Sequence, residues 1–159
     1  MSSERNRGGR PGGHQGNQRD WQPKARRANS PLDLAGYPCY FKGDKLDPVY
    51  LDQYARKIAT DFGNSSPRLT KSQMRGFFGD VKRVETRFRA TEDLDMAKER
   101  LLQLKAMAHE RWRKNKVPSE FRRFIEKNVD SVVDGMAFGA FVKHFEAVVA
   151  YSEGKLEQR

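Results

Sequence analysis

Cysteine is nearly absent from this sequence, since Cys39 is the single one among 159 residues. One thiol can form neither a disulfide within the chain nor a cysteine-rich metal site. The three histidines, His14, His109 and His144, are spread along the chain and match no metal-ligand spacing. The sequence therefore predicts no metal ion and no other cofactor, and the scarcity of cysteine favours the reducing environment of the cytoplasm.

Long apolar runs are also missing. No stretch approaches the roughly 18 apolar residues that a membrane-spanning helix needs, and no apolar run follows the basic N-terminus as in a signal peptide. Positive charge is in excess, with 31 Lys and Arg against 21 Asp and Glu and a formal net charge of +10. We therefore expect a cytoplasmic protein that contacts no membrane and binds a polyanion, most simply nucleic acid. A charge that serves only solubility is the alternative.

Motifs of catalysis are absent as well. The sequence has neither the phosphate-binding pattern GxxxxGK[ST] nor GxGxxG. His109 and Glu110 are adjacent, so on a helix they point in different directions. His144 fits a helix surface or a partly buried position, and Asp93 and Asp95 fit the start of a helix, where acidic groups favour the helix dipole. We therefore predict a protein that is not an enzyme, with a small ribonuclease that uses both helical histidines as an alternative.

The first 46 residues differ in composition from the rest. Residues 1–30 mix glycine with seven basic and two acidic residues, and this composition predicts a disordered basic tail. Such Arg/Gly tails can hold an RNA backbone without sequence preference, although a plain flexible extension is equally compatible. Residues 31–46 carry Tyr37, Tyr40 and Phe41 between prolines and glycines and are predicted to form an extended aromatic linker. The sequence leaves open whether this linker packs back on the domain or docks on a neighbour.

Residues 47–159 are predicted to form one all-α domain, a compact five-helix bundle that binds RNA. The Asp47–Pro48 pair resembles an N-cap followed by a proline in the first helical position. Thr70 and Gln73 have the spacing of a capping box and mark the clearest helix start in the chain. The apolar residues then recur at helical spacing in five segments, at about 48–62, 70–88, 92–113, 119–129 and 136–155.

The basic side chains of these helices are the candidate RNA-binding groups. Arginine can contact a phosphate with two hydrogen bonds, and lysine adds a point charge. Cations at the end of the third helix also favour its dipole, so part of that cluster has an explanation in stability. The candidate RNA-binding residues are Lys71, Arg75, Lys82, Lys105, Arg111 and Arg113.

Two sequence blocks carry a family resemblance. Residues 69–78 read LTKSQMRGFF, residues 141–151 read FVKHFEAVVAY, and between them a helix ends in AMAHERWR at 106–113. This order resembles the small subunit of the type III-A (Csm) CRISPR effector complex. That family begins its core with an L-T-x-x-Q-[LM]-R helix and ends with an E-A-[IVL]-[VA]-A-Y helix. In this chain the resemblance extends over about residues 69–155.

The resemblance implies a non-catalytic small subunit of an antiviral ribonucleoprotein. Several copies would stack along the backbone subunits that hold the guide RNA, and would contact the sugar–phosphate chain of the target RNA. The backbone and large subunits of the effector complex, guide RNA, target RNA and copies of itself are the implied partners. Arg75 matches an arginine of the family motif, and Arg111 or Arg113 resembles a basic residue near the end of its middle helix. A helical DNA-binding regulator and a general RNA-binding protein are the alternatives.

Overall fold

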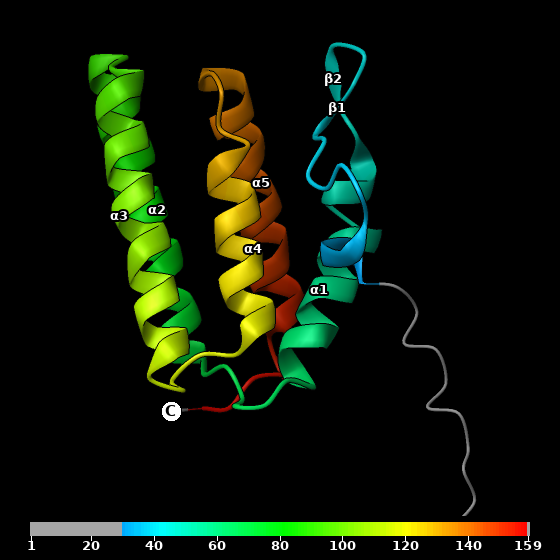
Figure 1. Cartoon of the computed structure of the whole chain (residues 1–159). Helices are drawn as coiled ribbons and strands as arrows, with labels where there is room; N and C mark the ends of the chain where they lie inside the picture. Colours follow the sequence, from blue (N-terminus) through cyan, green and yellow to red (C-terminus); the bar gives the residue numbers. More distant parts are fainter. Residues whose placement is uncertain (1–29, 159) are drawn as a thin grey trace, which may run out of the picture.

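Five helices make up most of residues 30–158, the part of the chain that this computed structural model describes (Figure 1). They are α1 (Gln53–Gly63), α2 (Lys71–Thr91), α3 (Leu94–Arg113), α4 (Ser119–Asp130) and α5 (Gly135–Ser152). Two short 3₁₀ helices, η1 (Pro31–Asp33) and η2 (Pro48–Tyr50), and an antiparallel hairpin of β1 (Phe41–Lys42) and β2 (Lys45–Leu46) precede them. The predicted all-α fold with five helices is confirmed. The predicted tail, residues 1–30, lies outside the described residues except for Ser30.

The helices lie side by side with their long axes roughly aligned. Figure 1 shows α2 and α3 as an antiparallel pair at one side, α4 and α5 in the middle, and α1 with the N-terminal segment at the other side. Helix α5 contacts both α1 and α2, and α4 contacts α3. Every turn between consecutive helices therefore falls at one end of the bundle or the other, which brings loops that are distant in sequence together.

Local capping sets where α2 begins. The hydroxyl oxygen of Thr70 accepts a hydrogen bond from the backbone N–H of Gln73 at 3.1 Å, and the Gln73 side chain accepts one from the N–H of Thr70 at 3.0 Å. The predicted capping box is therefore confirmed. The predicted start of the first helix at Asp47 is wrong, because Asp47 caps the 3₁₀ helix η2 through the N–H of Val49. The non-helical backbone of Asp52 then separates η2 from α1.

Phenylalanine rings from four helices form the centre of the core. Edge-to-face pairs join α1 to α4 through Phe62 and Phe121, with ring centroids 5.6 Å apart, and α4 to α5 through Phe124 and Phe145 at 5.1 Å. Phe77 of α2 meets Phe121 at 4.9 Å. Rings that interlock in this geometry stabilise the fold beyond the area they bury, so the helices form a fixed support for the side chains on their surface.

Segment 31–46 packs back on the helices, one of the two alternatives that the sequence left open. Tyr37 and Tyr40 are buried, and Tyr40 donates its hydroxyl proton to the Asn128 side chain at 2.7 Å. Nδ1 of His144 lies 2.6 Å from the carbonyl oxygen of Tyr50, so it carries the proton, and Nε2 accepts from the Tyr37 hydroxyl at 2.7 Å. His144 is therefore fully buried rather than at the helix surface, because three tyrosines of the N-terminal segment cover it.

Candidate nucleic-acid interface

Basic residues gather at the end of the bundle where α2 and α4 begin and α1, α3 and α5 end. The Gln73 side chain donates a hydrogen bond to the carbonyl oxygen of Lys116 at 2.8 Å, and the N–H of Lys71 donates to the carbonyl of Glu157 at 2.8 Å. Three connecting segments, 64–71, 110–118 and 152–158, are thereby held together, and they carry seven basic and three acidic residues. With Arg75, the cations of this surface, here called the basic end, are Arg68, Lys71, Arg111, Arg113, Lys114, Lys116 and Lys155.

The turns between α2 and α3 and between α4 and α5, at the opposite end of the bundle, are acidic and are here called the acidic end. The turns at 91–95 and 130–136 carry five acidic residues and no lysine or arginine. Helix ends account for part of this separation of charge, since Asp93 and Asp134 cap α3 and α5 and Arg111 and Arg113 lie in the last turn of α3. Lys71 lies in the first turn of α2, where a cation opposes the dipole. The charge of the basic end is therefore not explained by helix stability alone.

Lys71 and Arg75 share one carboxylate at the end of α5. The Lys71 ammonium lies 3.1 Å from Oε2 of Glu153, and a guanidinium nitrogen of Arg75 lies 3.0 Å from Oε1. Hydrogen bonds from Arg75 and Lys71 lower the pKa of Glu153. The Arg75 side chain is 65% exposed, and exposed ion pairs contribute little to stability because water screens them. A phosphate group can therefore take the place of this carboxylate at small cost.

Arg111 and Arg113 stand at the end of α3. The guanidinium carbon of Arg111 lies 5.0 Å from the centroid of the Phe77 ring, which orients it by a cation–π contact. Arg113 is exposed and forms no ion pair within residues 30–158. The structure thus brings four of the six sequence-predicted residues, Lys71, Arg75, Arg111 and Arg113, to the basic end.

Lys82 and Lys105 lie away from that end. Lys82 is seven residues from Arg75 on α2, about 10 Å along the helix, and its ammonium lies 3.5 Å from the buried carboxylate of Glu85. Lys105 lies 2.6 Å from Asp130, which is part of the acidic end. The sequence could not separate these two lysines from the others, because the partner of each depends on which helix packs beside it.

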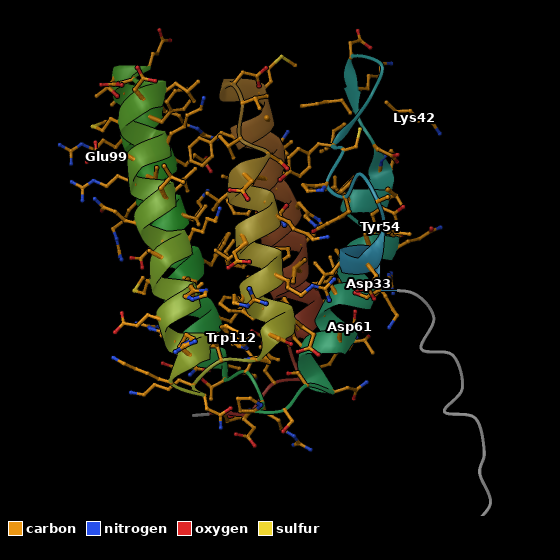
Figure 2. All side chains as sticks on the ribbon, viewed as in Figure 1. Asp33, Lys42, Tyr54, Asp61, Glu99 and Trp112 are labelled. Atoms are coloured by element: carbon orange, nitrogen blue, oxygen red, sulfur yellow. The ribbon has the colours of Figure 1, made fainter. Side chains whose placement is uncertain are left out.

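Trp112 is an aromatic residue of the basic end, in the segment 110–118 (labelled in Figure 2). The guanidinium of Arg122 lies 4.1 Å from the centroid of its ring, and the His109 ring is 5.4 Å away. A base needs an open ring face to stack on, and these two neighbours occupy the Trp112 ring. The basic end therefore offers charge rather than a stacking platform.

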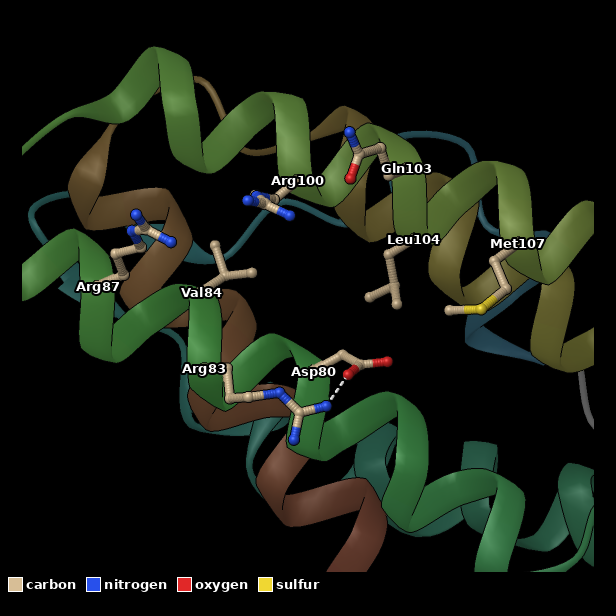
Figure 3. Close-up of a pocket in the computed structure, with 8 residues that line it drawn as sticks. All are labelled: Asp80, Arg83, Val84, Arg87, Arg100, Gln103, Leu104 and Met107. Atoms are coloured by element: carbon tan, nitrogen blue, oxygen red, sulfur yellow. Dashed lines mark hydrogen bonds and ion pairs between the residues drawn. The ribbon is translucent and has the colours of Figure 1, made fainter.

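A second basic surface lies between α2 and α3 and was not predicted from the sequence. It is a groove of about 480 Å³, here called the arginine groove, lined by Asp80, Arg83, Val84, Arg87, Arg100, Gln103, Leu104 and Met107 (Figure 3). The four-residue spacing of Arg83 and Arg87 places both on one helix face. That Arg100 joins them follows only from the packing of α3 against α2.

The positions of the side chains also bear on a metal site and on the pair of histidines that the ribonuclease alternative needs. Within residues 30–158, no group of three His, Cys, Asp or Glu side chains is placed to hold a metal ion, and none of the helices in this range is long and apolar enough to cross a membrane. His109 is half exposed, with Nδ1 3.6 Å from a carboxylate oxygen of Glu126. His144 is buried on a different helix, and burial lowers its pKa to about 4. The two histidines thus do not form the acid–base pair that the ribonuclease alternative needs.

Comparison with known proteins identifies the family. The family model described as Csm2 Type III-A matches residues 45–154, which include all five helices. No curated protein matched the chain, and no solved structure matched it. The match covers more than half of the sequence and agrees with the resemblance carried by residues 69–78 and 141–151. The chain therefore belongs to the Csm2 family, the small subunit of the type III-A CRISPR effector complex.

Proposed function

We propose that this small subunit is non-catalytic and contacts the sugar–phosphate chain of the target RNA through its basic end. The observation that carries the proposal is the convergence of cations from α2, the α3–α4 connection and the end of α5 on one surface. Each cation that neutralises a phosphate releases condensed counterions, which favours binding. Arg75 and Arg113 are the principal phosphate ligands in this proposal, since both are exposed.

When a guide RNA recognises the target RNA by base pairing, this subunit does not need to recognise the target sequence itself. Base pairing with the guide supplies the sequence specificity, so the protein needs to recognise only the charge and shape of the backbone. The basic end fits this task, because most of its cations are exposed while the Trp112 ring is in contact with Arg122 and His109. In this proposal several copies stack beside the backbone and large subunits and the guide RNA, in the cytoplasm.

The geometry disfavours the DNA-binding alternative. A helix-turn-helix protein places its recognition helix at a steep angle to the helix before it. Here α2 and α3 run antiparallel along their length (Figure 1), and α4 and α5 are covered by neighbours on both sides. None of the five helices is therefore presented as a recognition helix.

Binding measured over a range of salt tests the proposal. The double variant Arg75→Ala/Arg113→Ala of the full chain should bind single-stranded RNA more weakly, and the slope of log K against log salt should fall by about 0.7 for each phosphate that the protein no longer neutralises. The matched control is Lys42→Ala/Lys143→Ala, which removes two exposed lysines at other surfaces. An equal weakening in both variants would contradict a site at the basic end, and so would a fall of many degrees in the melting temperature of the first variant.

A further inference from the structure

The arginine groove has no role in the function proposed for the basic end. Two of its arginines stand on different helices, Arg87 on α2 and Arg100 on α3 (Figure 3). Neither forms an ion pair with any side chain of residues 30–158. The one carboxylate of the groove, Asp80, is bound by Arg83. Two guanidinium groups of the groove are therefore free to bind an anion, and the groove as a whole carries an excess of positive charge.

The groove leads away from the basic end. Arg111 belongs to the basic end and lies against Phe77, which sets α3 beside α2 at that point. Met107 and Asp80, one turn further along each helix, already line the groove. Arg100 lies 11 residues before Arg111, about 16 Å along the helix. An RNA strand that runs over the basic end can therefore continue along the α2–α3 pair and remain in contact with positively charged side chains.

We propose that the arginine groove is a second phosphate-binding site for the RNA strand that passes over the basic end. This inference rests on the proposed function and extends it to Arg87, Arg100 and the side-chain amide of Gln103. Guanidinium groups bind phosphate with paired hydrogen bonds. No aromatic ring lines the groove, so bases are not stacked there and binding is independent of sequence.

The apolar floor of the groove distinguishes RNA from an acidic protein segment. A helix that docks in a groove needs exposed apolar anchors to bury. Leu104, at the floor, is only 5% exposed, and Val84 and Met107 are partly buried beside it. The exposed groups are the arginines and Gln103. The hydrogen-bonding groups that a partner meets are therefore the guanidinium groups and the Gln103 amide, which suit a phosphodiester chain.

Variants of the full chain in which neutral glutamine replaces arginine test the groove. Arg87→Gln/Arg100→Gln should weaken binding of single-stranded polyuridine and polyadenosine equally, by about three- to tenfold, and lower the salt slope by about 1.4. The control Lys42→Gln/Lys143→Gln has the same change in net charge and should keep the wild-type slope. A groove variant that behaves as the control would overturn the inference. If the groove variant binds RNA normally but no longer co-purifies with the other subunits, the groove is a protein-docking surface and the inference is wrong.

A positional measurement separates the groove from general charge effects. In a Cys39→Ser background, Gln103→Cys places a thiol in the groove, and Glu146→Cys places one on the exposed side of α5. Saturating polyuridine should slow maleimide labelling at position 103 severalfold and leave position 146 unchanged. If RNA does not slow labelling at position 103, while RNA binding still depends on Arg75 and Arg113, the groove is not an RNA-binding site. The function proposed for the basic end would then remain. If RNA binding is unaffected by substitutions at either surface, both the inference about the groove and the proposed function are wrong.

Discussion

The hydroxyl of Tyr37 is one of several hydrogen-bonding groups that connect segment 31–46 to the helices, and Tyr37→Phe removes that single group. Burial raises the pKa of Tyr37 far above its ordinary value, so the hydroxyl keeps its proton. It donates this proton to Nε2 of His144 at 2.7 Å and accepts from the Asn128 amide at 3.0 Å. Without the oxygen, an acceptor on His144 and a donor on Asn128 have no partner inside the protein. Each unpaired buried group costs about 1–3 kcal/mol, so for two such groups we expect stability to fall by about 2–6 kcal/mol in total.

Urea unfolding of the full chain measures this change in stability. The denaturation midpoint of Tyr37→Phe should fall while the m-value stays the same, because the ring itself remains packed against Tyr50 at 6.0 Å. Tyr54→Phe is the matched control, since the Tyr54 hydroxyl has no hydrogen-bond partner within residues 30–158, and it should change stability by less than about 0.5 kcal/mol. If Tyr37→Phe is as stable as the control, segment 31–46 is not held by this network.

Two further predictions concern His144 and its neighbour in the core. The folded pKa of about 4 lies below the ordinary 6.5, so below pH 6.5 the unfolded chain binds a proton that the folded chain does not. Stability should therefore fall as the pH falls from 6.5 to 4, by about 3 kcal/mol in total, and a comparison of urea unfolding between wild type and His144→Gln at each pH isolates this contribution. Phe145→Ala should cost about 3–5 kcal/mol because that ring is fully buried between α4 and α5. Val133→Ala, at a side chain that is 68% exposed, should cost less than about 0.5 kcal/mol, and equal midpoints in urea would show that Phe145 is not a core residue.

Signals that act within a few residues allowed prediction of most of the fold. The apolar spacing within each helix and the Thr70–Gln73 capping box are local, because both partners of the cap lie within one turn. The Asp47–Pro48 signal failed for a related reason. An N-cap followed by proline starts a 3₁₀ helix as readily as an α-helix, and only the backbone at Asp52 decides which continues.

The sequence by itself determined that the chain is helical, rich in positive charge and similar to the Csm2 family. Only the tertiary structure decided which cations share a surface. Lys71 and Arg111 lie at the same end of the bundle, whereas Lys105 faces the acidic Asp130, and Arg87 and Arg100 line the same groove. These neighbours are set by how one helix is shifted and rotated against the next, which depends on the packing of buried rings distant in sequence. A single sequence carries the periodicity of each helix but no direct measure of that relative position.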